Sequence, residues 1–452
     1  MKPWLRRLMQ GGATAAAGPE RGGATNQPVG GTYRPNRDTG TRGVDPRSGP
    51  DGTALGPAVP ADLQRRALLH RHGHLAGFEI SWAEDPSCAL EPPLAAEGLL
   101  QAMGATAASG RLALARLSVQ QLSAPGLAER VRPGMMFAVV DAGSAFSSEV
   151  PWVAAVRSRA GQVGTLGRPR QDAAFVVLDA GDLPMSSVLA WADASHAAAP
   201  GCLLVATGLR SIDDLEAALS GPFEMAAGLF DRVSQMQDSA PMTPDLLGLC
   251  RLLGRALTEP DTRQLGDDIR ADADLSYRLL RHANSPLLGF KRKVESVEQA
   301  LQVLGLQALT RLLTVLLVVR SRRRTTAMAL HELALTRAHF LESHARALTA
   351  PAPALYITGL LSLLDVMMQQ PMKRMLDCIS LLEESRDALV HRRGPWHPLL
   401  ELARCLESGR MSAARELSLP LGGLAVAQAA MEQARQAAAS VTAELRGVWR
   451  MS

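Results

Sequence analysis

The sequence predicts a multidomain protein in which an α/β segment, residues 62–236, is followed by an all-α segment, residues 237–452. Three observations lead to this fold class. Short apolar runs alternate with amphipathic stretches only up to about residue 236, apolar stripes at helical spacing fill the remainder, and residues 1–61 are rich in glycine and proline. The alternation is typical of β-α units, whereas the later stripes are typical of packed helices.

The amino-terminal segment, residues 1–61, is predicted to be a disordered tail. Its first 60 residues contain 12 Gly and 8 Pro but only six Leu, Ile, Val or Phe, which is too little apolar surface to offset the entropy of ordering. The tail also carries the whole net charge of +4, because Lys/Arg and Asp/Glu balance in the rest of the chain. A folded part without net charge argues against non-specific nucleic-acid binding, which depends on phosphate neutralisation.

In the second segment, four apolar runs are predicted to be buried strands: residues 111–119, 135–143, 173–181 and 201–209. Amphipathic stretches at residues 186–199 and 211–220 predict helices between them, the second of which begins with Ser211 as a capping residue. Strands that are connected by helices imply β-α units around a parallel sheet or a barrel.

Metal and membrane signals are weak along the chain. His70, His72 and His74 alternate, but Gly73 favours a turn between two strands, where histidines are ordinary loop residues. The five cysteines lie far apart, which fits buried thiols in a reducing compartment.

No stretch approaches the ~20 apolar residues of a bilayer-spanning helix, and the amino terminus lacks a secretory signal. A cytoplasmic location is therefore expected.

In the third segment, residues 274–283 predict a helix that turns four apolar side chains to a core: Leu275, Leu279, Leu280 and Ala283. The polar residues His282, Asn284 and Ser285 follow on it directly, and Pro286 prevents the helix from continuing. Asn284 tolerates left-handed geometry and can also bond neighbouring backbone, so a structural role at the helix end explains it.

A second helix is predicted over residues 296–305. Ser296 and Gln299 form a capping box at its start, Gly305 can cap its end with a left-handed conformation, and a new helix begins at residue 306. The basic runs at residues 289–293 and 320–326 are interpreted as solvated helix ends rather than nucleic-acid contacts.

Residues 271–309, ADADLSYRLLRHANSPLLGFKRKVESVEQALQVLGLQAL, resemble the characteristic motif of the HDOD domain. The family pattern is an acidic pair, L-s-x-x-L-L-x-x-x-N-S, a basic turn, a further helix and a terminal L-G. Its positions are occupied here by Leu279, Leu280, Asn284, Ser285 and Gly305. The resemblance implies an all-α relative of the HD phosphohydrolases without their metal-binding His-Asp pair, in which these five residues serve structure or interaction.

The absence of that pair is tested at GLLSLLDVMM, residues 359–368, which resembles the G-L-L-H-D-I-G turn of true HD enzymes. Ser362 and Leu363 stand where His and Asp would bind metal, and Asp365 comes two positions too late to substitute. A hydroxyl and an isobutyl group cannot hold a divalent ion. This stretch therefore resembles the version of HDOD that follows an EAL-type domain, a packing helix pair without an active site.

The resemblance extends in this way to residues 62–236, as a TIM-like barrel of the EAL-type cyclic-di-GMP phosphodiesterases. In active members, clustered carboxylates and an asparagine bind two metal ions, and a lysine and a glutamate act on the attacking water. Glu79 in AGFEISW, residues 76–82, matches the motif that names the family, and Asp179 in FVVLDAG, residues 175–181, matches the aspartate of K-I-D.

The remaining positions of the family's site are altered. Arg116 stands at the metal-binding asparagine, Val177 at the lysine, and Thr207 and Arg210 at two glutamates, while Asp141 is the most that is kept of a further acidic pair. An arginine among the ligands puts a cation where metal ions must sit. The degenerate site predicts no catalytic residue, no bound metal and no cofactor.

The resulting hypothesis is a bacterial signal-transduction protein that is not an enzyme. It would act as a regulatory scaffold, by protein–protein interaction through its HDOD and degenerate EAL-like domains. The expected partners are regulatory proteins, and a homo-oligomer is also open. The main alternative is a metal-independent cyclic-di-GMP receptor, with phosphate contacts from Arg116 and Arg210. Two further hypotheses are a phosphodiesterase with shifted ligands and nucleic-acid binding through the basic runs.

Overall fold

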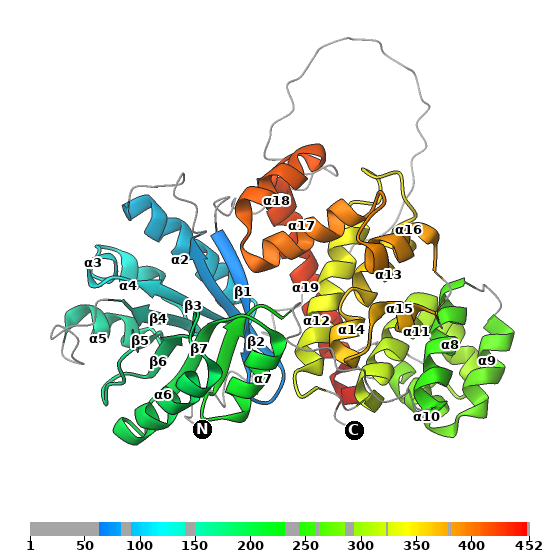
Figure 1. Ribbon diagram of the computed structural model, residues 1–452, viewed down its shortest axis with the longest axis horizontal. Helices are drawn as coiled ribbons and strands as arrows, with labels where there is room; N and C mark the ends of the chain where they lie inside the picture. Colours follow the sequence, from blue (N-terminus) through cyan, green and yellow to red (C-terminus); the bar gives the residue numbers. More distant parts are fainter. Residues whose placement is uncertain are drawn as a thin grey trace, which may run out of the picture. The chain divides into compact units, whose positions relative to one another are not determined.

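The computed structural model describes residues 63–82, 92–140, 150–230, 244–258, 262–284, 293–321, 324–377, 379 and 381–449. The predicted tail, residues 1–61, lies outside the described residues. A closed barrel is followed along the chain by helices, and both belong to one compact unit (Figure 1). The structure therefore confirms the predicted fold class, an α/β barrel joined to an all-α part.

The barrel closes in chain order through eight strands: β1 (Leu63–His70), β2 (Leu75–Trp82), β3 (Leu112–Leu117), β4 (Met135–Val139), β5 (Gln162–Leu166), β6 (Phe175–Asp179), β7 (Leu203–Leu209) and β8 (Met225–Gly228). β1 runs antiparallel to both neighbours, whereas every other neighbouring pair is parallel. The carboxyl ends of the parallel strands therefore share one mouth of the barrel, where TIM-like barrels place their sites.

The four strands predicted from apolar runs correspond to β3, β4, β6 and β7. β5 and β8 lacked a comparable signal, because QVGTL contains polar residues and MAAG consists mostly of alanine and glycine. The turn predicted at the histidines joins β1 to β2, with Gly73 at a φ of +76°.

Within the described residues of the barrel segment, six helices accompany the strands: α2 (Pro92–Ala108), α3 (Val119–Leu122), α4 (Leu127–Arg130), α5 (Pro151–Ser158), α6 (Met185–Ala198) and α7 (Ile212–Ser220). α6 and α7 are the two predicted helices. Ser211 caps α7 as expected, since its Oγ accepts a hydrogen bond from the Asp214 amide at 3.1 Å.

The all-α part contains these helices: α8 (Pro244–Thr258), α9 (Thr262–Ala271), α10 (Ala273–Ala283), α11 (Val297–Ser321), α12 (Ala327–Ser343), α13 (Ala352–Leu361), α14 (Leu364–Met368), α15 (Met372–Leu376), α16 (Glu383–Arg386), α17 (His397–Ser408), α18 (Met411–Ser418) and α19 (Leu424–Trp449), with a π-helical turn over Asp387–His391 and a 3-10 turn over Leu419–Leu421. α12 is buried along almost its whole length and packs against both α13 and α19. It forms the centre of this part (Figure 1).

α11 breaks at Gly305, which has a φ of 74° and a ψ of 169°. Glycine is the residue that tolerates this backbone conformation, and the break falls where one helix was predicted to end and the next to begin. The Gln299 amide donates to Ser296 Oγ as predicted, but Gln299 Oε1 accepts from Glu295 rather than from Ser296. Among the described helices, none alone is long and apolar enough to span a bilayer. The two arms of α11, which meet at 101°, reach that length and apolar composition only when they are taken together.

Candidate functional site

The guanidinium of Arg116 lies among polar side chains at the mouth of the barrel. From β3, its Nη1 contacts Asp179 Oδ2 of β6 at 2.6 Å, and its Nη2 contacts Glu79 Oε1 of β2 at 3.1 Å. Nη2 also donates to Thr207 Oγ1 of β7 at 2.7 Å. Four strands thus bring together the two carboxylates that the sequence singled out and two of the residues that replace family ligands.

This arrangement keeps the arginine charged. Burial raises the pKa of the Glu79 carboxyl, and Arg116 opposes that shift. Burial alone would lower the pKa of Arg116, but Glu79 and Asp179 outweigh it and raise the pKa. A fixed cation therefore fills the space between the two carboxylates. Within the described residues, no three His, Cys, Asp or Glu side chains are grouped so that they could hold a metal ion.

Of the remaining predicted positions, the two that the structure describes, Val177 and Arg210, do not join this cluster. Arg210, which follows β7, is 68% exposed and forms an ion pair with Asp182. Val177 is buried in β6, and Asp141 lies outside the described residues. Of the two arginines proposed to contact phosphate, Arg116 is thus held by carboxylates and Arg210 faces solvent.

A second guanidinium lies beside Ser362 in the helical part, the residue that the resemblance aligns with a histidine of HD enzymes. Arg337 of α12 is fully buried, and its Nη2 lies 2.6 Å from Glu407 Oε2 of α17. Its Nη1 donates to Ser362 Oγ at 3.2 Å, at the position where an HD enzyme would have histidine. The Phe230 ring lies 5.7 Å from the guanidinium carbon, within cation–π range.

The sequence interpretation missed Arg337, because no family motif includes it. A signal was nevertheless present: Arg337 interrupts the apolar stripe Leu330, Ala334 and Leu341 at helical spacing. A charged residue in such a stripe must find a buried partner. Nothing in the local sequence identifies Glu407 as that partner, since it lies 70 residues away.

Asn284 connects two parts of the HDOD motif through its side chain. The amide nitrogen donates to the carbonyl oxygens of Leu280 and Val294, both at 2.8 Å, and Oδ1 accepts from the Val294 amide at 2.8 Å. Its φ of −93° corrects the suggestion of a left-handed backbone. Asn284 therefore ends α10 and bonds backbone both in that helix and at Val294.

The other motif residues are placed as follows. Leu279 is fully buried, while Leu280 is partly buried against the core. His282 is also buried, and burial lowers its pKa. Ser285 lies outside the described residues. Among the described residues of this polar group, His282 is therefore packed in the interior and Asn284 ends α10.

The histidines of the β1–β2 turn lie against one another. The His70 ring centroid is 4.9 Å from that of His72 and 4.7 Å from that of His74. His70 Nε2 lies 3.1 Å from Glu224 Oε1, and burial, with smaller effects from His72 and Arg71, lowers the pKa of His70 to about 4. His70 is therefore a neutral, buried residue near neutral pH.

One junction between the barrel and the helices is built on Glu216 of α7. Its Oε2 lies 2.8 Å from Nη1 of Arg324, whose side chain is fully buried, and its Oε1 accepts from the Thr326 amide at 3.1 Å and hydroxyl at 2.7 Å. Arg324 also contacts Asp213 and donates to the Val366 carbonyl. Two carboxylates of α7, with Glu216 making most of the contacts, thus hold the start of α12 against the barrel.

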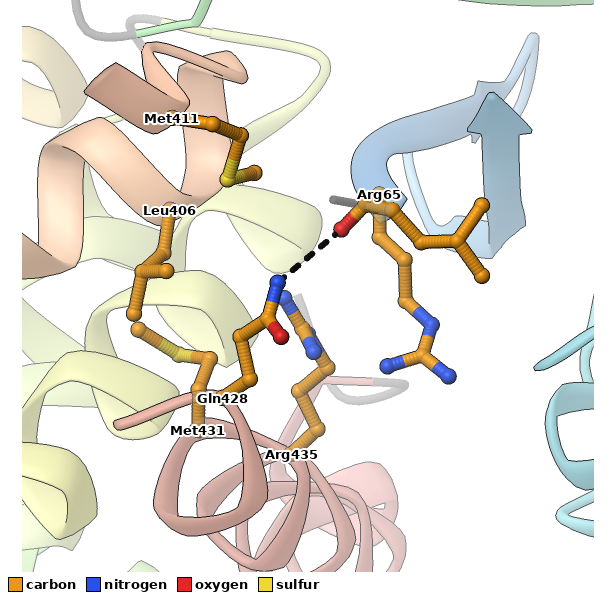
Figure 2. Close-up of a pocket in the computed structure, with 7 residues that line it drawn as sticks. Arg65, Leu406, Met411, Gln428, Met431 and Arg435 are labelled. Carbon is orange, nitrogen blue, oxygen red and sulfur yellow. Dashed lines mark hydrogen bonds between the residues drawn. The ribbon is translucent and has the colours of Figure 1, made fainter. Parts of the chain in front are cut away.

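A second junction joins β1 to α17, α18 and α19 around a small cavity of about 10 Å³ (Figure 2). Figure 2 shows Gln428 of α19 pointing to β1, where its Nε2 donates to the Leu63 carbonyl at 3.2 Å. Nearby, Arg65 Nη1 lies 2.8 Å from Glu432 Oε2. The space is enough for about one water molecule, so this cavity belongs to the packing of the junction.

Glu216→Ala is expected to lower the free energy of unfolding by about 2–4 kcal/mol, because it removes a partner of buried Arg324 and the acceptor of the Thr326 amide. Urea unfolding followed by circular dichroism measures the change. Glu129→Ala removes an exposed glutamate and is the matched control, with an expected change within about 0.5 kcal/mol. Equal stability of both variants would contradict the proposed role of Glu216.

Comparison with known proteins gives matches in both parts of the chain. Residues 245–391 match the family model of the HDOD domain. The chain is 25% identical over 222 residues to the uncharacterized protein YuxH of Bacillus subtilis, covering 48% of this chain and 54% of YuxH. It is 24% identical over 225 residues to the cyclic di-GMP phosphodiesterase CdgJ of Vibrio cholerae, covering 48% of this chain and 51% of CdgJ. The chain thus spans about half the length of these relatives.

Similar solved structures are EAL domains. The EAL domain of Mycobacterium smegmatis DcpA is 16% identical, with a TM-score of 0.28, over 37% of this chain and 89% of that one. The Xanthomonas citri FimX EAL domain in complex with c-diGMP is 12% identical, with a TM-score of 0.29, over 37% of this chain and 84% of that one.

The family match and the closed barrel define a class of protein, in which an HDOD domain follows a TIM-like barrel. This arrangement agrees with the resemblance of the sequence to the EAL–HDOD proteins.

Proposed function

We propose that this protein is a non-catalytic regulator in cyclic-di-GMP signalling, which acts by binding other proteins through its HDOD domain and its barrel. The observation that carries the proposal is the position of Arg116 between Glu79 and Asp179. A metal ion that used these carboxylates would lie beside a fixed positive charge. Two unit charges of the same sign that lie 4 Å apart repel each other by about 4 kcal/mol in partly buried surroundings. The arginine therefore opposes binding of the metal ions that hydrolysis requires.

The helical part supports the same proposal. Arg337 and Glu407 neutralise each other beside Ser362, so this position is filled by a buried ion pair. The two junctions hold the barrel and the helices in one unit. What this arrangement offers to other molecules is a set of surfaces, which protein partners recognise. The similarity to CdgJ, a cyclic di-GMP phosphodiesterase, supports the connection to cyclic-di-GMP signalling.

The enzymatic part of the proposal is tested with the purified full chain. We expect no hydrolysis of cyclic-di-GMP above the buffer rate with either Mg²⁺ or Mn²⁺, with CdgJ as the positive control. Turnover that depends on the metal and on Glu79 or Asp179 would refute the proposal.

Arg116→Asn is expected to strengthen Mn²⁺ binding by about tenfold or more, because ~1.4 kcal/mol of relieved repulsion corresponds to a factor of ten. Calorimetry with Mn²⁺ measures the affinity. Arg116→Lys keeps the positive charge and is the control that should remain like the wild type. Equal Mn²⁺ affinity of all three proteins would show that the guanidinium does not exclude the ion.

The interaction part of the proposal is tested by affinity capture with the full chain as bait. We expect a defined kinase, regulator or motility component, whose binding must then be reproduced with purified proteins. If no captured protein binds the purified chain, the interaction part of the proposal is wrong.

Metal-independent binding of cyclic-di-GMP is the second candidate function. The observation in its favour is Arg210, whose guanidinium is largely exposed and forms a surface ion pair with Asp182, a weak interaction that a ligand can displace. Arg116 contributes less than expected, because three acceptors already hold it. Calorimetry with cyclic-di-GMP decides: absence of heat up to high micromolar ligand would eliminate this candidate.

A further inference from the structure

We infer that the small cavity at the junction of β1 with α17, α18 and α19 binds a single halide ion, of which chloride is the common example (Figure 2). The cavity lies on the helix side of β1. Successive residues of a strand face opposite sides, so Arg65 is turned to α19 while Arg66 is turned to the other face of the strand. The proposed site is therefore separate from the Arg116 cluster and from Arg210.

Arg65 brings two unused hydrogen-bond donors to this cavity. Its side chain is only 7% exposed, and its Nη1 donates to Glu432 Oε2 of α19 at 2.8 Å. The other two nitrogens, Nε and Nη2, are buried and have no hydrogen-bond partner among the described residues. These two nitrogens form one edge of the planar guanidinium, so a single acceptor can bond to both of them. A buried donor without an acceptor is costly, and an anion at this edge would remove that cost.

The charged groups around the cavity carry one excess positive charge. Arg435 of α19 shares the Glu432 carboxylate with Arg65, since its Nη1 lies 3.2 Å from the same Oε2. Figure 2 shows the side chains of Arg65 and Arg435 extending toward each other. The other lining residues are uncharged: Leu63, Leu406, Met411, Gln428 and Met431. Two guanidinium groups thus share one carboxylate, and a bound anion would complete the neutralisation of a buried group.

The electrostatics of Arg65 agree with this assignment. Burial lowers the pKa of Arg65 to about 10, Glu432 opposes the shift, and Arg435 adds to it. One carboxylate is therefore not enough to offset burial and the second cation. A further negative charge beside the guanidinium would favour its charged form.

The size of the cavity selects the class of anion. Its volume of about 10 Å³ holds about one water molecule, which excludes phosphate, carboxylates and nucleotides. A halide ion is spherical, accepts hydrogen bonds from any direction and is close to water in size. A halide ion neutralises the excess charge, whereas a water molecule does not. Because the lining comes from both the barrel and the helices, the bound ion would also stabilise their contact.

The first test is thermal unfolding of the full chain in increasing sodium chloride, with sodium gluconate added to keep the ionic strength constant. Gluconate is too large for the cavity, and general screening is the same in every sample. We expect a saturable rise in unfolding temperature, by about 1–2 °C in a tenfold excess of chloride over the dissociation constant. Sodium bromide should give a similar rise.

Arg65→Met should abolish this rise, because it removes the excess charge and both unused donors. The variant leaves Glu432 paired with Arg435, so no carboxylate is left without a cation, and circular dichroism checks that it is folded. Arg281→Met, at an exposed arginine of α10, is the matched control and should keep the chloride dependence of the wild type. Anomalous diffraction from crystals of the wild-type chain in bromide locates the ion without any substitution.

A saturable chloride effect that Arg65→Met abolishes, together with a bromide peak in the cavity, supports the site. Equal unfolding temperatures in chloride and gluconate would mean that the cavity holds water only and would overturn the proposal. A chloride effect that persists in Arg65→Met, or bromide that is found only outside the cavity, would overturn it as well. None of these results depends on whether the protein binds or hydrolyses cyclic-di-GMP or binds a protein partner.

Discussion

Arg337→Met is expected to lower the free energy of unfolding by about 3–5 kcal/mol, one of the two largest effects that we expect from a single substitution. The substitution leaves Glu407 as a buried carboxylate without the guanidinium that contacts it at Nε and Nη2. It also removes the donor to Ser362 Oγ and the cation that faces the Phe230 ring. Urea unfolding of the full chain measures the loss.

The double variant Arg337→Met with Glu407→Leu separates the two origins of this effect. Replacing a buried ion pair by apolar residues of similar volume is often neutral, whereas removing one partner leaves an uncompensated charge. We therefore expect the double variant to recover most of the stability that Arg337→Met loses. If the losses of the two single variants simply add in the double variant, the two side chains are not coupled and the assignment of the pair is wrong.

Gly359→Ala is expected to lower the free energy of unfolding by about 3 kcal/mol, at the upper end of the usual range for overpacking. A Cβ on Gly359 would lie 2.5 Å from both the Cα and the amide nitrogen of Ala338. These are backbone atoms of α12, so no side chain can rotate away and the α12–α13 contact must open. Thermal or urea unfolding measures the change.

Gly248→Ala is the matched control for this substitution. Gly248 also lies in a helix, α8, but a Cβ there would meet no atom within 4 Å. Alanine is favoured over glycine in helices, so we expect this variant to gain about 0.5–1 kcal/mol. Stability of Gly359→Ala equal to that of the wild type would mean that α12 and α13 do not cross as closely as the structure shows.

The fold class was predictable because its signals are local. Apolar runs identified β3, β4, β6 and β7, whereas β5 and β8 escaped because short strands with polar residues, alanine or glycine do not differ from loops in composition. The break in α11 was also predictable, since glycine at residue 305 marks it in the sequence. For Asn284, the predicted hydrogen bond to neighbouring backbone is present at Leu280, whereas the left-handed conformation is not. Its hydrogen bonds to Val294, ten positions later, had no local signal.

The sequence predicted which residues belong to the candidate site but not which of them are in contact. Family resemblance picked out Glu79, Arg116 and Asp179 one at a time, but their distances follow from the closure of the barrel.

Residue type and spacing in the chain specified where helices and most strands form, and which family positions had lost their metal ligands. Which charges meet depended on the folded packing: Arg116 with Asp179 across 63 residues, Arg337 with Glu407 across 70, and Arg65 beside Arg435 at one cavity. The reason is physical, since periodicity reports only on neighbours within a few residues, while a buried ion pair or a lined pocket requires elements from distant parts of the chain to be brought to within a few ångströms.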